Sequence, residues 1–151
     1  MEMRLLTEKS GAIFVLKMLE KMHEECGFLS VNREKVFKQI CDAVMKNECY
    51  ILVDDEKIIG TVAVEVYEPW YSLDKRFQDR WLYVSPNFRN IQTFKMLLQQ
   101  AIEHAKYHKL PLYIMLNVEG ADRKRKLFKT YMKEAMEVFE VSYVGGSFQA
   151  N

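Results

Sequence analysis

Two histidines of this chain have a spacing that could bind a metal ion. His104 and His108 lie four residues apart, so on a helix they share one face, and imidazole is a common metal ligand. The intervening residues form no HExxH motif, and the sequence offers no evident third ligand. We therefore predict a solvated helix end here, where cationic side chains are ordinary, and no metal site.

A run of cations, Arg123–Lys126 followed by Lys129, is the only basic cluster. Such a cluster can contact the phosphates of a nucleic acid, or it can be the charged start of a helix beside Asp122. The chain as a whole has 22 basic and 21 acidic residues, a net charge of +1. That balance leaves no global electrostatic signal for a nucleic acid or an anionic membrane, so we expect neither as a partner.

Aromatic and sulfur-containing residues supply two further candidates. Trp70, Tyr71 and Phe77 fall in a segment, 68–79, without clear periodicity, which we interpret as a loop. They could line a groove for a substrate, plug a sheet edge or form an interface. The cysteines, at positions 26, 41 and 49, form no CxxC pair and predict reduced, mostly buried thiols.

Periodicity predicts the elements that must position these residues. Thr7 and Asn32 are expected near the starts of the first two helices, whose apolar stripes include Ile13 and Phe37. Asp54 to Lys57 reads as the turn of a β-hairpin. The strands are expected at about 3–6, 50–53, 58–66, 81–84, 112–118 and 138–144, and the helices at about 8–25, 32–44, 91–106 and 122–135.

This order predicts an α/β (α+β) domain. We expect a mixed central sheet of about six or seven strands, flanked by about four helices, with an antiparallel meander followed by parallel crossovers. The 151 residues fit a single domain, 1–151. We find no signal peptide and no apolar run of about 20 residues, as a membrane helix needs, so we expect a cytoplasmic protein.

The segment from Arg80 to Leu98 carries a resemblance to a known family. It reads RWLYVSPNFRNIQTFKMLL, which is an apolar strand, V-x-P, an aromatic–Arg pair, and a loop that opens a helix with a Leu-Leu pair. This pattern resembles the central acetyl-CoA motif of the GNAT N-acyltransferase superfamily. Gly60 in the preceding hairpin and Tyr131 near the end of the chain match that family's pattern. The general character of the sequence is similar to that of small GNAT-like proteins of bacteriophages.

The resemblance implies a cofactor site and two catalytic residues. Acetyl-CoA would be the co-substrate and no metal would take part. Tyr131 would protonate the departing thiolate, and Glu65 would serve as the base for the amine, with Asp79 as the alternative. The main chain of Leu82 and Val84 would hold the pantetheine, and Asn117 would lie at a strand end. The pyrophosphate would be held by Arg89, Asn90, Ile91, Gln92, Thr93 and Phe94.

The chain departs from the family at its phosphate loop. Gln92 and Phe94 stand where glycines are usual, and glycine lets the backbone approach phosphates closely. Phe94 also fits the helix stripe and can turn into the core instead. Two functions follow: an acetyl-CoA-dependent N-acyltransferase acting on an unidentified small-molecule or protein amine, or a catalytically degenerate GNAT-fold structural or interaction protein. Exposed strand edges allow a homodimer.

Overall fold

A computed structural model describes residues 1–26, 30–116 and 138–140. The elements that it contains, in chain order, are β1 (Glu2–Leu5), the 3-10 turn η1 (Lys9–Gly11), α1 (Ala12–Cys26), α2 (Arg33–Met45), β2 (Cys49–Asp54), β3 (Lys57–Tyr67), β4 (Arg76–Val84), the 3-10 turn η2 (Pro86–Phe88), α3 (Ile91–Tyr107), β5 (Leu112–Leu116) and β6 (Val138–Glu140). The helix predicted at 122–135 lies outside the described residues.

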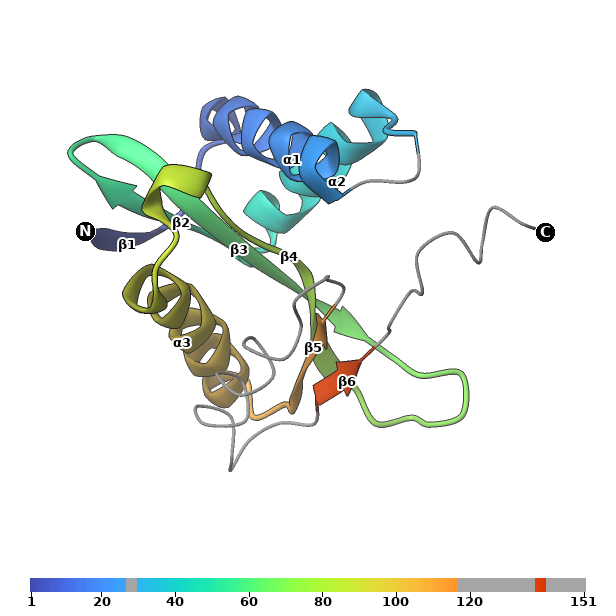
Figure 1. Cartoon of the computed structure of the whole chain (residues 1–151). Coiled ribbons are helices and arrows are strands. Elements are labelled where there is room, and N and C mark those ends of the chain that lie inside the picture. The colour runs from blue at the N-terminus through green and yellow to red at the C-terminus, as the bar shows by residue number, and fades with distance from the viewer. Residues whose placement is uncertain (27–29, 117–137, 141–151) are drawn as a thin grey trace.

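The described strands form one mixed sheet in chain order, β1 to β6. β1 to β4 are antiparallel neighbours, while β4 pairs with β5, and β5 with β6, in parallel. Helices α1 and α2 cover one face of this sheet, and α3 covers the other (Figure 1). The predicted mixed α+β fold, with a meander that precedes parallel crossovers, is confirmed.

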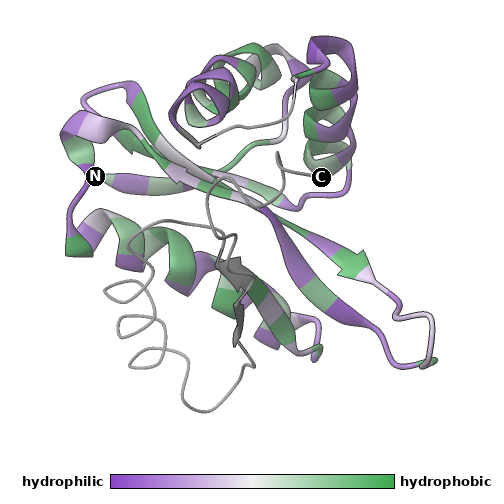
Figure 2. Ribbon diagram, turned by 45° about the vertical axis from the view of Figure 1, so that its right-hand side comes forward, coloured by the Kyte–Doolittle hydropathy of each residue, from purple (hydrophilic) through white to green (hydrophobic). Residues whose placement is uncertain are grey.

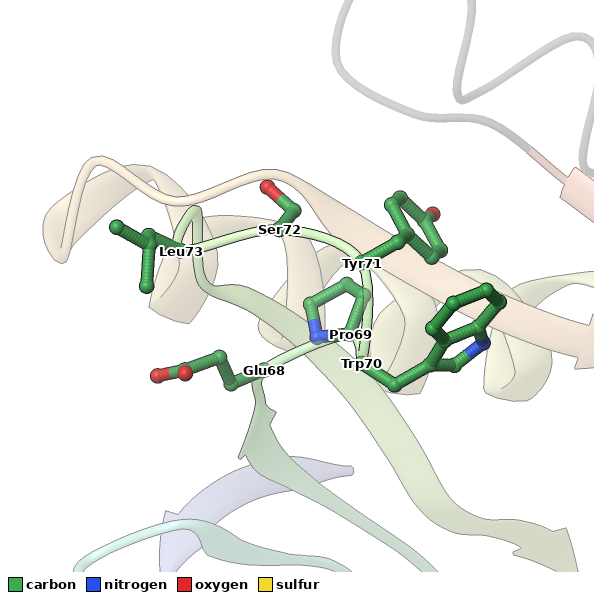
Figure 3. Close-up of a pocket in the computed structure, with 6 residues that line it drawn as sticks. All are labelled: Glu68, Pro69, Trp70, Tyr71, Ser72 and Leu73. Carbon is green, nitrogen blue, oxygen red and sulfur yellow. The ribbon is translucent and has the colours of Figure 1, made fainter.

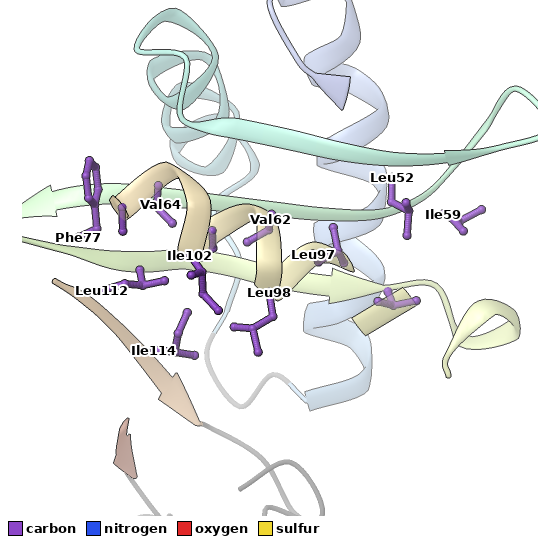
Figure 4. Close-up of a cluster of buried hydrophobic side chains, with 13 residues drawn as sticks. Leu52, Ile59, Val62, Val64, Phe77, Leu97, Leu98, Ile102, Leu112 and Ile114 are labelled. Carbon is purple, nitrogen blue, oxygen red and sulfur yellow. The ribbon is translucent and has the colours of Figure 1, made fainter. Parts of the chain in front are cut away.

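The core beneath α3 is built by the predicted stripe of that helix. Leu97, Leu98 and Ile102 point at strand residues such as Val62 and Leu112 (Figure 4). Phe94 packs, partly buried, against the same cluster, so it takes the inward alternative that its position in the stripe allowed. Burial of these side chains is the main force that fixes α3 on the sheet.

Gly60 on β3 allows α3 to approach the sheet closely. A Cβ at this position would lie 3.0 Å from Leu97 Cδ1 and 3.2 Å from the carbonyl oxygen of Tyr83. The second contact is with backbone, which cannot move aside as a flexible side chain can. The glycine is therefore needed for packing between β3 and α3.

Helices α1 and α2 are amphipathic, with apolar residues turned to the sheet (Figure 2). Two sequence predictions fail here, because Ile13 and Phe37 are exposed. Thr7 does not cap α1 either: the 3-10 turn η1 precedes that helix and has Glu8 at its N-cap position. The second helix starts near Asn32 as predicted, and Asn32 caps it, since its side chain accepts a hydrogen bond from Lys35 N at 2.9 Å.

The segment predicted as a loop at 68–79 is shorter than expected, because β4 begins at Arg76 and pairs there with Tyr67. Phe77 is buried in the core, so it cannot line a groove with the other aromatics. The hairpin tip carries Trp70 and Tyr71 beside each other, with ring centroids 5.6 Å apart, around a cavity of about 400 Å³ (Figure 3). Trp70 is 92% exposed.

Cys49 is buried and Cys41 is half-buried, and both are free thiols. Burial raises the pKa of the Cys49 thiol to about 12. No described helix is long and apolar enough to cross a membrane.

Candidate acyl-transfer site

The parallel strands β4 and β5 separate soon after they meet. They pair only at Phe77 with Leu112 and at Gln78 with Tyr113. Beyond that point β4 continues along β3, whereas Ile114 on β5 pairs with Val138 on β6. A V-shaped opening between the carboxyl-terminal halves of β4 and β5 follows from this pairing.

The edge of β4 that faces this opening pairs with no described strand beyond Gln78. Ser85 N donates to Ile59 O on β3 at 2.8 Å, and polar groups of successive strand residues point alternately to opposite edges. The main chains of Leu82 and Val84 therefore point away from β3. Arg89 Nε donates to Val84 O at 2.9 Å, from the open side. The two residues predicted to hold pantetheine thus lie on the open edge, and the binding itself stays a prediction.

Past the open edge, the chain turns through η2 and enters α3 under a side-chain cap. Asn90 Oδ1 accepts from Thr93 N at 2.9 Å, and Thr93 Oγ1 accepts from Asn90 N at 3.2 Å. The Thr93 hydroxyl also donates to the backbone, with Phe88 O at 2.8 Å. This reciprocal capping box fixes the direction in which the helix begins.

The first turn of α3 leaves amides available to a ligand. Within the described part of the chain, the N–H groups of Ile91 and Gln92 have no acceptor, and both side chains are exposed. A helix N-terminus with free N–H groups suits phosphate. The positive φ angles at described non-glycine residues lie elsewhere, at Asn47, Asp55, Glu56 and Lys109. The turn from 85 to 94 therefore needs no glycine for its backbone conformation.

Arg89 is held at the rim of this turn. Besides Val84 O, its guanidinium binds Glu25 Oε2 on α1 at 2.5 Å. Glu25 Oε1 accepts from the Tyr83 hydroxyl at 2.6 Å. Burial, with help from Glu25, raises the pKa of Tyr83 to about 12. The end of α1 is thus joined to β4 and to the phosphate turn.

Glu65, the predicted base, lies on the α1 and α2 side of the sheet among polar partners. Its Oε1 accepts from Gln78 Nε2 at 2.9 Å, and its Oε2 lies 3.4 Å from Arg80 Nε. One third of its side chain is exposed, at 33%. Asp79, the alternative, is opposite Val64 on β3 and half-buried.

Sequence analysis gave no role to Arg80, although its guanidinium is the centre of this polar cluster. It contacts Asp42 Oδ2 at 2.5 Å, and it lies 3.7 Å from Glu48 Oε2. The pKa of Asp42 is lowered, mainly by its hydrogen bond with Arg80, whereas burial raises the pKa of Glu48. The one available signal was a charged residue directly before the predicted apolar strand 81–84, but its partners are distant in the sequence.

The predicted solvated helix end at His104 is wrong. His104 is 7% exposed, stacks edge-on against Phe77 with ring centroids 4.8 Å apart, and shares a 2.8 Å hydrogen bond with the Tyr50 hydroxyl through Nδ1. Burial, with a smaller effect of His108, lowers its pKa to about 4. His108 is exposed as predicted. The described residues contain no cluster of three or more His, Cys, Asp or Glu side chains placed to bind a metal.

Several predicted residues fall outside the described residues. These are Tyr131, Asn117, the capping residue Asp122 and the basic run 123–129. Their predicted roles therefore stay predictions. The structure places Leu82 and Val84 on the open edge of β4 and the turn at 89–94 directly after it, while Glu65 lies on β3 opposite Gln78.

Solved structures with the same fold span almost the whole chain. One, a protein described as a probable acetyltransferase, has a TM-score of 0.71 at 18% identity and covers 97% of this chain and 99% of its own. A protein from Clostridium acetobutylicum described as a predicted acetyltransferase, solved with acetyl-CoA, has a TM-score of 0.66 at 12% identity and covers 99% of this chain and 96% of its own. An aminoglycoside acetyltransferase from an uncultured soil metagenomic sample, in complex with sisomicin, reaches 0.63 at 16% identity over 95% and 93%.

At these identities, the likeness concerns the fold. No curated protein sequence matches the chain. The family model described as the acetyltransferase (GNAT) family matches residues 16–131, well over half of the chain and including β4, the turn and α3. The chain therefore belongs to the acetyltransferase (GNAT) family.

Proposed function

We propose that this protein is an N-acyltransferase that moves an acetyl group from acetyl-CoA to an amine. The observation that carries the proposal is the V between β4 and β5, whose open edge at Leu82 and Val84 leads directly to the free amides of Ile91 and Gln92. An extended pantetheine arm can pair with a free strand edge, and a pyrophosphate can be bound by a helix N-terminus.

In the proposed reaction the amine nitrogen attacks the thioester carbonyl carbon. The new C–N bond forms, the C–S bond breaks, and the coenzyme leaves as a thiolate. Glu65 takes the proton from the ammonium form of the acceptor, directly or through water, and Tyr131 gives a proton to the thiolate. The second proton that the nitrogen loses as the amide forms passes to the Tyr131 phenolate, directly or through water, which restores the phenol. The exposed third of the Glu65 side chain is the part through which such a proton can pass.

Acetyl-CoA binding is the first test. A ligand that binds only the folded state stabilises it by about 2.7 kcal/mol when the ligand concentration is 100 times Kd. This stabilisation raises the melting temperature. We expect a shift at millimolar acetyl-CoA, followed by release of free thiol when a panel of mono-, di- and polyamines is added. Absence of any shift would reject the proposal. If thiol is released, Tyr131→Phe should lower turnover and leave CoA affinity unchanged; unchanged turnover removes Tyr131 from the mechanism.

The second candidate, a GNAT-fold interaction protein without catalysis, is favoured by one observation. Gln92 presents an exposed side chain at the first turn of α3, where the family commonly has glycine. If that side chain excludes phosphate, the wild type shows no acetyl-CoA shift and Gln92→Gly restores one. If the wild type binds and Gln92→Gly changes affinity little, Gln92 no longer favours this candidate, and thiol release in the presence of an amine rules it out. Phage origin, a cytoplasmic location and homodimer formation stay predictions.

A further inference from the structure

We propose that Arg80 is a positioning residue, which holds the bend of β4 at the point where β4 and β5 part. This inference rests on the proposed acyl transfer, because that point is the narrow end of the V. The observations that carry it are the strand register, the burial of the guanidinium and its four polar partners.

The register between β3 and β4 is interrupted at Arg80. Trp81 lies opposite Ala63 and Asp79 lies opposite Val64, so two neighbouring residues of β3 face three of β4. Arg80 is the extra residue of a β-bulge. Such a bulge bends its strand and increases the local twist.

The bulge coincides with the narrow end of the V. Gln78 forms the last pair with β5, and Arg80 follows two residues later. From there toward Leu82 and Val84, β4 pairs with β3 and no longer with β5. The bend at Arg80 therefore sets the angle at which the free edge of β4 leaves β5.

The guanidinium of Arg80 interacts with three separate parts of the chain, which are α2, the loop before β2, and β3. It donates to Gln39 Oε1 at 2.8 Å and to Asp42 Oδ2 at 2.5 Å on α2. It also lies within 4 Å of Glu48, just before β2, and of Glu65 on β3. With 7% of its side chain exposed, it has little freedom to move.

These partners need a planar, forked donor. Several N–H groups fixed in one plane can hydrogen-bond to Gln39 and Asp42 while the same charge stays within ion-pair distance of Glu48 and Glu65. A lysine ammonium is instead a single point charge on a flexible stem. Arg80→Lys therefore keeps a positive charge among the carboxylates and removes the simultaneous contacts. The matched control is Arg33→Lys, since Arg33 Nε also binds a carboxylate, Glu20 Oε1 at 2.6 Å, but its side chain is exposed.

The test compares wild type, Arg80→Lys and Arg33→Lys by three measurements. These are kcat for the best amine together with KM for acetyl-CoA, the acetyl-CoA dependence of the melting temperature, and hydrogen exchange of the peptide that contains residues 79–84. Displacing a reacting group by about 1 Å can cost on the order of 100-fold in rate. For Arg80→Lys we expect a 10- to 100-fold lower kcat, KM for acetyl-CoA within about threefold because the phosphate turn is distant, and faster exchange at 79–84. Arg33→Lys should match wild type in all three.

Equal kcat for Arg80→Lys and wild type would overturn the inference, as would unchanged exchange at 79–84. If Arg80→Lys fails to fold, Asp42→Asn gives the milder test. It keeps an acceptor at the position closest to the guanidinium but removes the charge, and should change kcat and exchange in the same direction. If the wild type turns over no amine, the proposed function fails, while exchange at 79–84 still decides whether Arg80 holds the bend.

Discussion

The two asparagine helix caps of this chain allow the phosphate turn to be tested with an internal control. Asn90 caps α3 at the proposed site, and Asn32 caps α2. Each side-chain oxygen accepts a hydrogen bond from the backbone N–H three residues later, at 2.9 Å in both cases. Asn90→Ala and Asn32→Ala therefore remove the same interaction, but only Asn90 adjoins the amides of Ile91 and Gln92 that follow the open edge of β4.

Both substitutions should destabilise the fold by similar amounts. Loss of an N-cap side chain costs about 1 kcal/mol, within a range of about 0.5–2. For a domain of this size, 1 kcal/mol lowers the melting temperature by about 2–4 °C. Urea denaturation should give each free energy of unfolding with an unchanged m value.

Acetyl-CoA affinity should separate the two variants. Without its cap, the first turn of α3 spends part of its time frayed, and only the helical turn presents the amides of Ile91 and Gln92 together. A penalty of about 1 kcal/mol corresponds to a Kd raised up to about fivefold for Asn90→Ala. Asn32→Ala should leave Kd unchanged in a calorimetric titration. Equal Kd values for the two variants would refute the assignment of the phosphate to this turn.

Three other predictions concern packing and titration. Gly60→Ala should destabilise by about 1–3 kcal/mol in urea, because its Cβ meets Leu97 and the Tyr83 carbonyl; an unchanged midpoint contradicts this. The pKa of His104 is lowered to about 4 in the folded state. Between pH 6.5 and 4 the unfolded chain therefore binds more protons than the folded chain, and the free energy of unfolding decreases by about 2–3 kcal/mol as the pH is lowered through this range. His104→Asn should flatten that part of the stability curve, and an identical slope would exclude His104 as its source. At pH 8 Cys49 should react with iodoacetamide only after unfolding, as site-resolved mass spectrometry can check; rapid labelling of the native protein argues against its burial.

Local patterns predicted the elements of this fold well where one face of an element is buried. The stripe of α3 was predicted with Phe94 included, because helical periodicity reports directly on which side meets the sheet. The start of β4 was missed, since Arg76 to Asp79 carry three polar residues around Phe77, and they pair with the end of β3 rather than form an apolar run. Pairing between strands is not visible in a single segment.

Of the candidate site, the sequence located the turn and the start of α3, but neither the cap of that helix nor the polar cluster around Arg80. Asn90 and Thr93 are close in the chain, so their capping pattern is a local signal. Arg80 and Asp42 are 38 residues apart and meet only when α2 packs on the sheet. The exposure of His104 was predicted wrongly because its burial depends on Tyr50 and Phe77, which are also distant from it in the sequence.

The two tryptophans give this molecule a pair of optical reporters at contrasting positions. Trp70 stands in solvent at the hairpin tip, while Trp81 is 6% exposed and donates from its indole nitrogen to Thr61 Oγ1 at 3.1 Å, one residue from the bend in β4. Trp70→Phe therefore leaves a single buried fluorophore beside the narrow end of the V. Its emission should be blue-shifted and resist quenching by acrylamide, and it should respond when acetyl-CoA enters. A red-shifted, readily quenched spectrum would mean that this part of β4 is open to water.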